Sequence, residues 1–189
     1  MIGTKRADDI HVRLSADLAN VEVAHNGTVI ASHAVGAVSM VTVDAGKGHD
    51  NVHVDANVMV NAHLTGGVGN DTLVGSVLLN VLVGGAGKDN LTGGPLNDVL
   101  QGDNGGDILT AGAGNDNCSG GNGVDTIDAG AGNDIVVGGN GRDGLTGGEG
   151  ADNFAGNDKL WEFRDLNGVE DTYTININPW DLIDDIFPW

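Results

Sequence analysis

The chain is poor in several residue types from which globular proteins usually build and staple a core. Its 189 residues include one cysteine, seven aromatic residues and eight Lys and Arg. A single cysteine excludes an intrachain disulfide framework. No apolar run approaches the length of a membrane span, and the opening residues lack the apolar stretch of a Sec signal. We therefore expect no transmembrane segment, and either any export follows another route or the chain is a fragment of a longer protein.

The charge balance is strongly acidic. There are 27 Asp and Glu, which gives a formal net charge of −19. Such a field repels phosphate, so nucleic acid and anionic membranes are not expected as partners, whereas cations are. The 33 glycines and the scarcity of aromatics are also typical of disordered chains, so composition alone leaves disorder open.

A nine-residue repeat decides between order and disorder. Ten units run from Gly66 to Ala155 with the pattern G-G-x-G-x-D-x-U-x, where U is apolar. Position six is Asp in nine units and Asn80 in the second. Position eight is always apolar: Leu73, Leu82, Leu91, Leu100, Leu109, Cys118, Ile127, Val136, Leu145 and Phe154. A disordered chain would not keep two chemistries in one phase, so the repeat predicts an ordered solenoid in the metal-bound state.

Each unit divides into a turn and a short strand. The segment x-U-x predicts a strand whose middle side chain points inward. The glycine-rich half must reverse the chain, which requires backbone angles that glycine adopts without a Cβ penalty. Two units then close a flattened coil of 18 residues, and units two apart stack their aspartates at about 4.8 Å.

Stacked carboxylates repel one another unless a cation lies between them or they are partly protonated. Ca²⁺ suits this gap because it takes six to eight oxygens, mixing carboxylates with backbone carbonyls. The block has no histidine and only Cys118 as a sulfur ligand, so zinc and copper are disfavoured there. We expect Cys118, at an inward position, to be a small buried hydrophobe rather than a reactive thiol. His49 and His53 flank Asp50, and we expect them to be exposed strand or turn residues, with a metal site there as the alternative.

The repeat resembles the RTX (repeats-in-toxin) calcium-binding nonapeptide of exported proteases, lipases, cytolysins and epimerases. The resemblance covers about 90 continuous residues plus an earlier unit, Ala45 to His53. It implies an all-β, right-handed parallel β-roll that binds about seven Ca²⁺. An eighth site, between Asp50 and Asp71, depends on how the chain accommodates three extra residues that we place within Val54–Thr65.

In that family each ion lies between two successive loops on the same edge. The first loop supplies its Asp and the carbonyls of its positions two and four. The second loop supplies its Asp and the carbonyls of its positions one and three. Carried over, the ligands on one edge are Gly46, Gly48, Asp50, Gly67, Gly69, Asp71, Gly84, Gly85, Ala86, Gly87, Asp89, Gly102, Asp103, Asn104, Gly105, Asp107, Gly120, Gly121, Asn122, Gly123, Asp125, Gly138, Asn140 and Asp143. On the opposite edge they are Gly94, Leu96, Asp98, Ala111, Gly112, Ala113, Gly114, Asp116, Ala129, Gly130, Ala131, Gly132, Asp134, Gly147, Glu149 and Asp152.

Some units depart from the family pattern. Asn80 replaces the Asp and its unit lacks the glycine of position four, so no ion is expected between Asn80 and Asp98. Leu96 at position four weakens the site that it would share with Asp116. Ala111 and Ala129 replace the first glycine, where only a carbonyl is needed.

The residue types are sorted into three regions. Residues 1–44 read as β-strands with a hairpin turn at Asn26-Gly27, and predict a cap over the first coil. Residues 45–155 form the roll. Residues 156–189 hold Trp161, Phe163, Tyr173, Trp180, Phe187 and Trp189 and predict an aromatic cap, for which a carbohydrate-stacking platform is the alternative.

Three classes of function are compatible with this chain. The first is a calcium-binding module that folds outside the cell after type I-like export and serves secretion or stability; Asp184-Asp185-Ile186-Phe187 loosely resembles the terminal signals of that route. The second is a polysaccharide- or cell-surface-binding module; ice binding is disfavoured because position three holds no threonine. The third, an enzyme, is not expected, since G-x-S-x-G and H-E-x-x-H are both absent. An accessory role beside a separate catalytic domain stays open.

Overall fold

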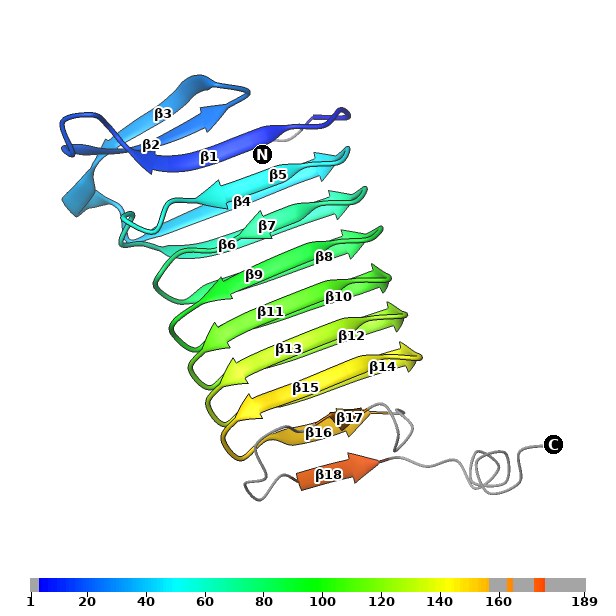
Figure 1. The fold of residues 1–189 in the computed structure, drawn as a ribbon. Helices are drawn as coiled ribbons and strands as arrows, with labels where there is room; N and C mark the ends of the chain where they lie inside the picture. Colours follow the sequence, from blue (N-terminus) through cyan, green and yellow to red (C-terminus); the bar gives the residue numbers. More distant parts are fainter. Residues whose placement is uncertain (1–3, 157–162, 165–171, 176–189) are drawn as a thin grey trace, which may run out of the picture.

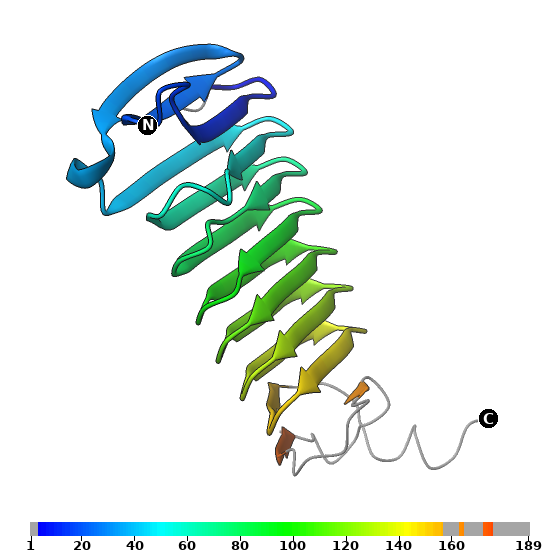
Figure 2. The same ribbon diagram turned by 60° about the vertical axis from the view of Figure 1, so that its left-hand side comes forward.

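The computed structural model describes residues 4–156, 163–164 and 172–175. These residues form a parallel β-solenoid, in which the chain winds through two facing sheets and adds one strand to each sheet per coil (Figures 1 and 2). The fold class expected from the repeat is therefore confirmed. No α-helix occurs in the described ranges, where the helical structure is a single 3-10 turn, Val35–Ala37.

We call the ten-stranded sheet A and the eight-stranded sheet B. Sheet A contains β1 (Asp9–Leu14), β2 (Asn20–His25), β3 (Thr28–Ala34), β5 (Asn51–Val54), β7 (Thr72–Val74), β9 (Asn90–Gly94), β11 (Ile108–Ala113), β13 (Thr126–Ala131), β15 (Gly144–Glu149) and β17 (Phe163–Arg164). Sheet B contains β4 (Met40–Lys47), β6 (Asn61–Val68), β8 (Asn80–Ala86), β10 (Val99–Gly105), β12 (Asn117–Gly123), β14 (Ile135–Gly141), β16 (Asn153–Gly156) and β18 (Thr172–Ile175).

Strand register follows the predicted coil of 18 residues. Val99 of β10 pairs with Asn117 of β12, and Ile108 of β11 pairs with Thr126 of β13. The position-eight side chains all point between the sheets, and the ten of them are at most 1% exposed. Because every coil places its apolar residue in the same column, the core is a continuous stack along the axis of the solenoid.

The first full coil is longer than the others. β5 pairs with β7 at an offset of 21 residues, Asn51 opposite Thr72. The return to 18 occurs in the next strand, where Ala62 lies opposite Asn80. The three extra residues therefore lie between β5 and β6, within the predicted range, and the turn between β4 and β5 keeps the regular geometry.

The N-terminal strands extend sheet A beyond the first coil. β1 pairs in parallel with β5, and β2 and β3 follow as an antiparallel hairpin. Asn26 and Gly27 have positive φ and form the predicted two-residue turn between β2 and β3. Val12, Val21 and Ala24 bury their side chains in the core, so this segment packs onto the roll.

The C-terminal aromatic segment is described only in part. β17 and β18 each add a strand in parallel to the end of a sheet. Trp161, Trp180, Phe187 and Trp189, with the acidic-apolar end at 184–187, lie outside the described residues. The aromatic cap and the export signal therefore stay predictions.

Candidate metal centre

Two kinds of turn connect the sheets and stack into two edges. The first edge joins sheet B to sheet A, at the right of Figure 1, and contains Asp50, Asp71, Asp89, Asp107, Asp125 and Asp143. The second edge joins sheet A to sheet B and contains Asn80, Asp98, Asp116, Asp134 and Asp152. The two sets of aspartates assigned to opposite edges from the sequence are thus separated as predicted.

Glycine at positions two and four lets neighbouring turns stack closely. Gly67 has a φ of +108°, and a Cβ on it would lie 2.1 Å from the carbonyl oxygen of Gly46 in the coil before. Gly69 has a φ of +145° and faces the carbonyl of Gly48 in the same way. A residue with a side chain is strained at this backbone angle and this approach, and Asp103, which holds position two of its own turn with a φ of +74°, is the exception. The carbonyls of adjacent turns are consequently held near each other.

One oxygen of each position-six carboxylate binds the backbone of the preceding coil. Asp89 Oδ1 accepts from the N–H of Asp71 at 2.7 Å, and Asp107 Oδ1 accepts from that of Asp89 at 2.8 Å. The same bond recurs along the second edge, for example from the Asp116 N–H to Asp134 Oδ1 at 2.8 Å. These bonds fix each carboxylate within its turn and form two continuous ladders.

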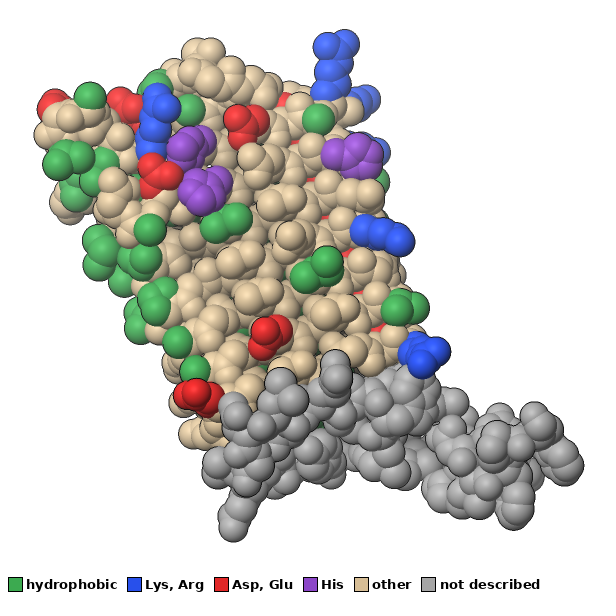
Figure 3. Space-filling model, viewed as in Figure 1, with side chains coloured by type: hydrophobic (Ala, Val, Ile, Leu, Met, Phe, Trp, Pro, Cys, Tyr) green, Lys and Arg blue, Asp and Glu red, His purple; other side chains and the backbone are tan. Residues whose placement is uncertain are grey.

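The second oxygen of most ladder carboxylates has no protein partner. Among the described residues, Oδ2 is buried and makes no hydrogen bond in Asp50, Asp71, Asp89, Asp107, Asp116, Asp125, Asp134 and Asp143. These side chains are at most 3% exposed. The space-filling view accordingly shows few acidic side chains on its face, although the chain is strongly acidic (Figure 3). A buried carboxylate oxygen without a donor is unfavourable unless a cation neutralises it or a proton binds it.

The ladders also raise carboxylate pKa values. Burial, followed by repulsion from neighbouring aspartates, raises the pKa of Asp89, Asp116 and Asp125 from 3.8 to about 6. Burial likewise raises the pKa of Asp71, Asp107 and Asp134. In the absence of a cation, burial in the roll therefore makes these aspartates easier to protonate than they are in the unfolded chain.

These residues fit calcium. The donor set consists of orphaned carboxylate oxygens next to glycine-rich turns with exposed carbonyls, which is the hard oxygen environment that Ca²⁺ prefers. The residues that would hold the ions are those carried over from the repeat pattern on each edge. Bound Ca²⁺ would supply the positive charge that the buried Oδ2 atoms lack.

Asn80 closes one gap in the second ladder without a cation. Its amide Nδ2 donates to the carbonyls of Ser76 and Leu78, at 3.0 and 2.9 Å, and to Asp98 Oδ1 at 3.0 Å. Ser76 and Leu78 occupy positions two and four of their turn, and Asp98 belongs to the next turn on that edge. The amide group thus binds three oxygens that a cation would otherwise share, which supports the expectation of no ion here.

The next turn on the second edge also departs from the pattern. Gly94, at position two, is not among the residues with positive φ, unlike its counterpart Gly112 in the turn that follows. Its N–H donates to Asp98 Oδ2 at 2.6 Å, so this carboxylate is satisfied by the protein. The turn with Leu96 at position four thus differs from a regular turn in its backbone and in its hydrogen bonding, as its departure from the sequence pattern suggests.

The first ladder has one rung that the repeat pattern did not reveal. The N–H of Asp8 donates to Asp50 Oδ1 at 2.7 Å, in the manner of the other rungs, and the Asp8 side chain is 3% exposed. Its own oxygens bind His25 Nε2 at 2.8 Å and the Thr4 N–H at 2.6 Å. Burial would raise the pKa of Asp8, but the bonds from His25 and Thr4 outweigh it and lower the pKa. Protein donors thus close the end of this ladder.

The signal that could have identified Asp8 is Asp8-Asp9-Ile10, which repeats the D-x-U part of the unit. Ile10 is fully buried, as position eight requires. Gly3 stands at position one of this unit, but Thr4 and Arg6 hold positions two and four, so the nonapeptide pattern is incomplete before Asp8.

Cys118 is fully buried in the core column. Burial, with repulsion from surrounding aspartates, raises the pKa of its thiol to about 12. A thiol with so high a pKa and no access to solvent is unreactive, which agrees with the expected core role.

The fold and the two ladders define a class of protein, a parallel β-solenoid whose turns are built to bind divalent cations. The family model for the RTX calcium-binding nonapeptide repeat matches four times, at residues 65–95, 83–118, 92–127 and 119–154. Residues 65–154 therefore consist of RTX calcium-binding nonapeptide repeats. No curated protein and no solved structure matches the chain. Within the described ranges, no helix has the length and apolarity needed to cross a bilayer.

Proposed function

We propose that this chain is a calcium-dependent folding module that works outside the cell, where it supports secretion and structural stability. The observation that carries the proposal is the pair of ladders with eight buried, unpartnered carboxylate oxygens. Without calcium these carboxylates repel one another and resist burial, so the coil is disfavoured. With calcium each turn binds the next, and ion binding contributes directly to folding.

We propose that the chain binds seven Ca²⁺ ions. Five lie on the first edge between successive aspartates from Asp50 to Asp143, since the extra residues of the long coil are on the other edge. Two lie on the second edge, between Asp116, Asp134 and Asp152. The pair Asp98–Asp116 is left out because Gly94 already satisfies Asp98 Oδ2.

A calcium titration followed by circular dichroism tests this function. In EGTA the strand signal should be largely lost, and millimolar Ca²⁺ should restore it. Mg²⁺ at the same concentration is the control and should restore little, because it prefers a near-ideal octahedral shell with retained water. A strand signal that stays unchanged in EGTA would refute coupled folding.

The extracellular role rests on the calcium requirement. Proteins with RTX repeats are typically secreted, and calcium is abundant outside cells and scarce inside them. The chain would therefore stay unfolded before export and fold on arrival. Removing residues 156–189 should abolish export by a type I system while leaving the calcium titration of the repeat block in place; unaltered export would contradict this assignment.

A surface-binding role is the second candidate. Asn104, Asn122 and Asn140 form an exposed row in which each amide donates to the one before it, at 2.9 and 2.7 Å. Such a row offers evenly spaced donors and acceptors to a polysaccharide. A glycan array probed with and without calcium, using Asn122→Ala as the comparison, would decide it. We propose no catalytic activity, because the sequence lacks the nucleophile and metalloprotease motifs named above.

A further inference from the structure

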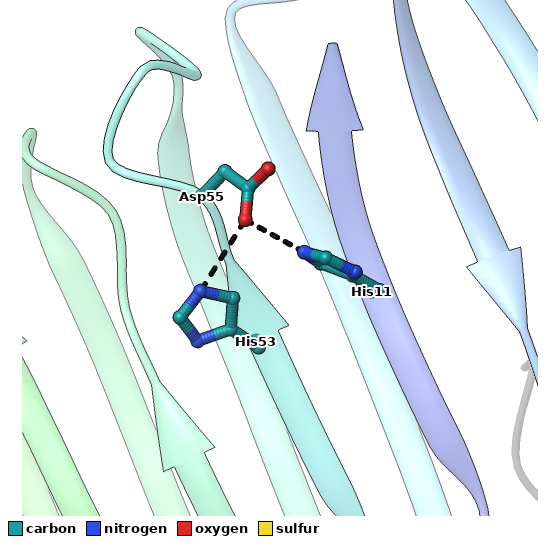
Figure 4. A group of neighbouring side chains, drawn as sticks. All are labelled: His11, His53 and Asp55. Carbon is teal, nitrogen blue, oxygen red and sulfur yellow. Dashed lines mark hydrogen bonds and ion pairs between the residues drawn. The ribbon is translucent and has the colours of Figure 1, made fainter. Parts of the chain in front are cut away.

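We propose that His11, His53 and Asp55 form a transition-metal site, best suited to Zn²⁺, that ties the N-terminal strands to the first coil of the roll. This site is distinct from the calcium ladders in position and in ligand chemistry. Its three side chains come from β1, from β5 and from the segment just after β5 (Figure 4).

Strand pairing brings the two imidazoles together. β1 lies parallel to β5 with His11 opposite His53. The neighbours Ile10, Val12 and Val52 point into the core, so the alternation of a strand turns both histidines to the outer face of sheet A. Their ring centroids are 5.3 Å apart at an interplanar angle of 65°. The two rings are therefore adjacent on the outer surface.

The long coil supplies the third ligand. β5 ends at Val54, and Asp55 begins the segment that contains the three extra residues. The Asp55 N–H donates to the Val12 carbonyl at 2.9 Å, and the Val58 N–H donates to the Asp55 carbonyl at 2.9 Å. These bonds fix the backbone on both sides of the carboxylate. The other coils are three residues shorter here, which gives this insertion a specific structural role.

The carboxylate lies between the two rings. Asp55 Oδ1 is 2.6 Å from His11 Nε2 and 3.4 Å from His53 Nε2. The three ligand atoms all lie within 4.8 Å of one another. Among the described residues, no other group of three His, Cys, Asp or Glu side chains brings its ligand atoms this close together. Tetrahedral zinc with ligands at about 2.1 Å separates its ligand atoms by about 3.4 Å, so small side-chain adjustments suffice.

The ligand set separates this site from the calcium sites. Imidazole nitrogen suits zinc and other borderline metals, whereas Ca²⁺ takes oxygen ligands. Two imidazoles and one carboxylate leave a fourth position for water, and all three side chains are half-buried, so that an ion can enter from solvent. A bound ion would link β1 directly to the chain that follows β5. The N-terminal strands would then be held by metal as well as by backbone pairing.

The test is a Zn²⁺ titration by calorimetry on the full chain saturated with Ca²⁺ and free of any histidine tag. One zinc per chain should bind, and Co²⁺ in its place should give the visible absorption of a tetrahedral complex. His53→Ala and Asp55→Asn should each weaken zinc binding at least about tenfold. His63→Ala is the matched control, because His63 is exposed on β6 in sheet B, and it should leave the affinity unchanged.

The thermal midpoint gives a second measurement. Zinc should raise it in the parent chain and in His63→Ala, but not in His53→Ala or Asp55→Asn, since only ligands bound to the folded state stabilise it. A parent chain that binds no zinc overturns the proposal. So does zinc binding that persists undiminished in both variants. Calcium-dependent strand formation is measured separately in each variant, so failure of the zinc site is distinguishable from failure of the calcium function.

Discussion

At position six of the repeat, the exchange of one oxygen for an amide nitrogen decides what the turn can bind. Asp in this position leaves an unpartnered buried oxygen, whereas Asn80 places an N–H group among the oxygens of Ser76, Leu78 and Asp98. The Asp carboxylate repels its neighbours unless a cation is bound, whereas the Asn80 amide needs no cation. In this turn the single exchange from Asp to Asn supplies a donor where a cation would otherwise be needed.

Asn80→Asp should convert this closed turn into a calcium site. The variant loses three hydrogen bonds from the amide and gains a like charge beside Asp98, so at micromolar calcium it should be less stable by about 1–3 kcal/mol. In millimolar calcium it should bind one ion more than the parent chain. Equilibrium dialysis with metal analysis measures the count, and chemical denaturation measures the stability.

Asn90→Asp is the control for that variant, since Asn90 is exposed on a strand of sheet A and takes no part in a turn. It adds the same formal charge and should leave the ion count unchanged. An Asn80→Asp chain with the parental ion count and parental low-calcium stability would show that the amide is not the substitute for an ion.

Position four has the strictest demand for glycine. Gly123 has a φ of +148°, and a Cβ there would lie 1.2 Å from the carbonyl oxygen of Gly105. Gly123→Ala should therefore lower the free energy of unfolding in calcium by at least about 1–3 kcal/mol. Gly144→Ala provides the comparison, because its nearest neighbour is 3.9 Å away, and it should shift stability by no more than about 1 kcal/mol. Urea unfolding of both variants in saturating calcium measures the difference; equal effects would contradict the stacking argument.

At the scale of the element, the ladder behaves as a set of coupled carboxylates rather than as separate sites. Each carboxylate accepts one N–H from the coil before it and lies near the next aspartate along the edge. Removal of calcium therefore exposes every rung to the repulsion of its neighbours. Protons are the other species that can relieve it.

Acidification should stabilise the calcium-free roll. The pKa of Asp89, Asp116 and Asp125 is about 6 in the fold against an ordinary value of 3.8, because they are buried next to like charges. A raised folded-state pKa means that the fold binds more protons than the unfolded chain, so its stability grows as pH falls from 7 through 6 toward 4 and is lost as pH rises through 6. Circular dichroism in EGTA between pH 4.5 and 7.5 should show strand content increasing toward acid.

The same protons should compete with calcium. Calcium affinity at pH 5 should be lower than at pH 7, because the ions must displace protons from the ladder carboxylates. A calcium-free chain that shows the same strand content across this range would indicate that the carboxylates do not oppose folding.

The periodic elements were predictable from the sequence and the aperiodic contacts were not. Position eight and the ladder aspartates repeat in phase, so one unit defines the environment of all of them. The repeat pattern does not reveal Asp8, because Thr4 and Arg6 replace the glycines of positions two and four, although its backbone joins the first ladder. The meeting of His11 with Asp55 depends on the pairing of β1 with β5 across 42 residues, and the short match of Asp8-Asp9-Ile10 to the repeat is too weak a signal to predict that register. His49, which also flanks Asp50, instead accepts the N–H of Asn70.

At the scale of the whole molecule, the solenoid is a one-dimensional stack in which each coil contacts the coil before and the coil after it (Figure 2). In such a stack stability is approximately a sum of coil and interface contributions. The N-terminal end of the first ladder differs from its middle. There His25 and the Thr4 N–H bind the oxygens of the Asp8 carboxylate, in place of an ion. Because protein groups close this end of the ladder, the first repeat aspartate would bind an ion on one side only, whereas an aspartate in the middle would bind one on each side.

Asp107→Asn and Asp50→Asn should therefore differ in the number of ions lost. Asp107 lies between Asp89 and Asp125 and would contribute to two calcium sites, whereas Asp50 would contribute to one, because Asp8 above it has no free oxygen for an ion. We expect two fewer bound ions in Asp107→Asn and one fewer in Asp50→Asn, by equilibrium dialysis in millimolar calcium. The central variant should also show a higher calcium midpoint for folding, since it interrupts the stack and leaves two shorter segments. Equal losses in the two variants would mean that the ions are not shared between successive turns, and the ladder would then be a series of independent sites.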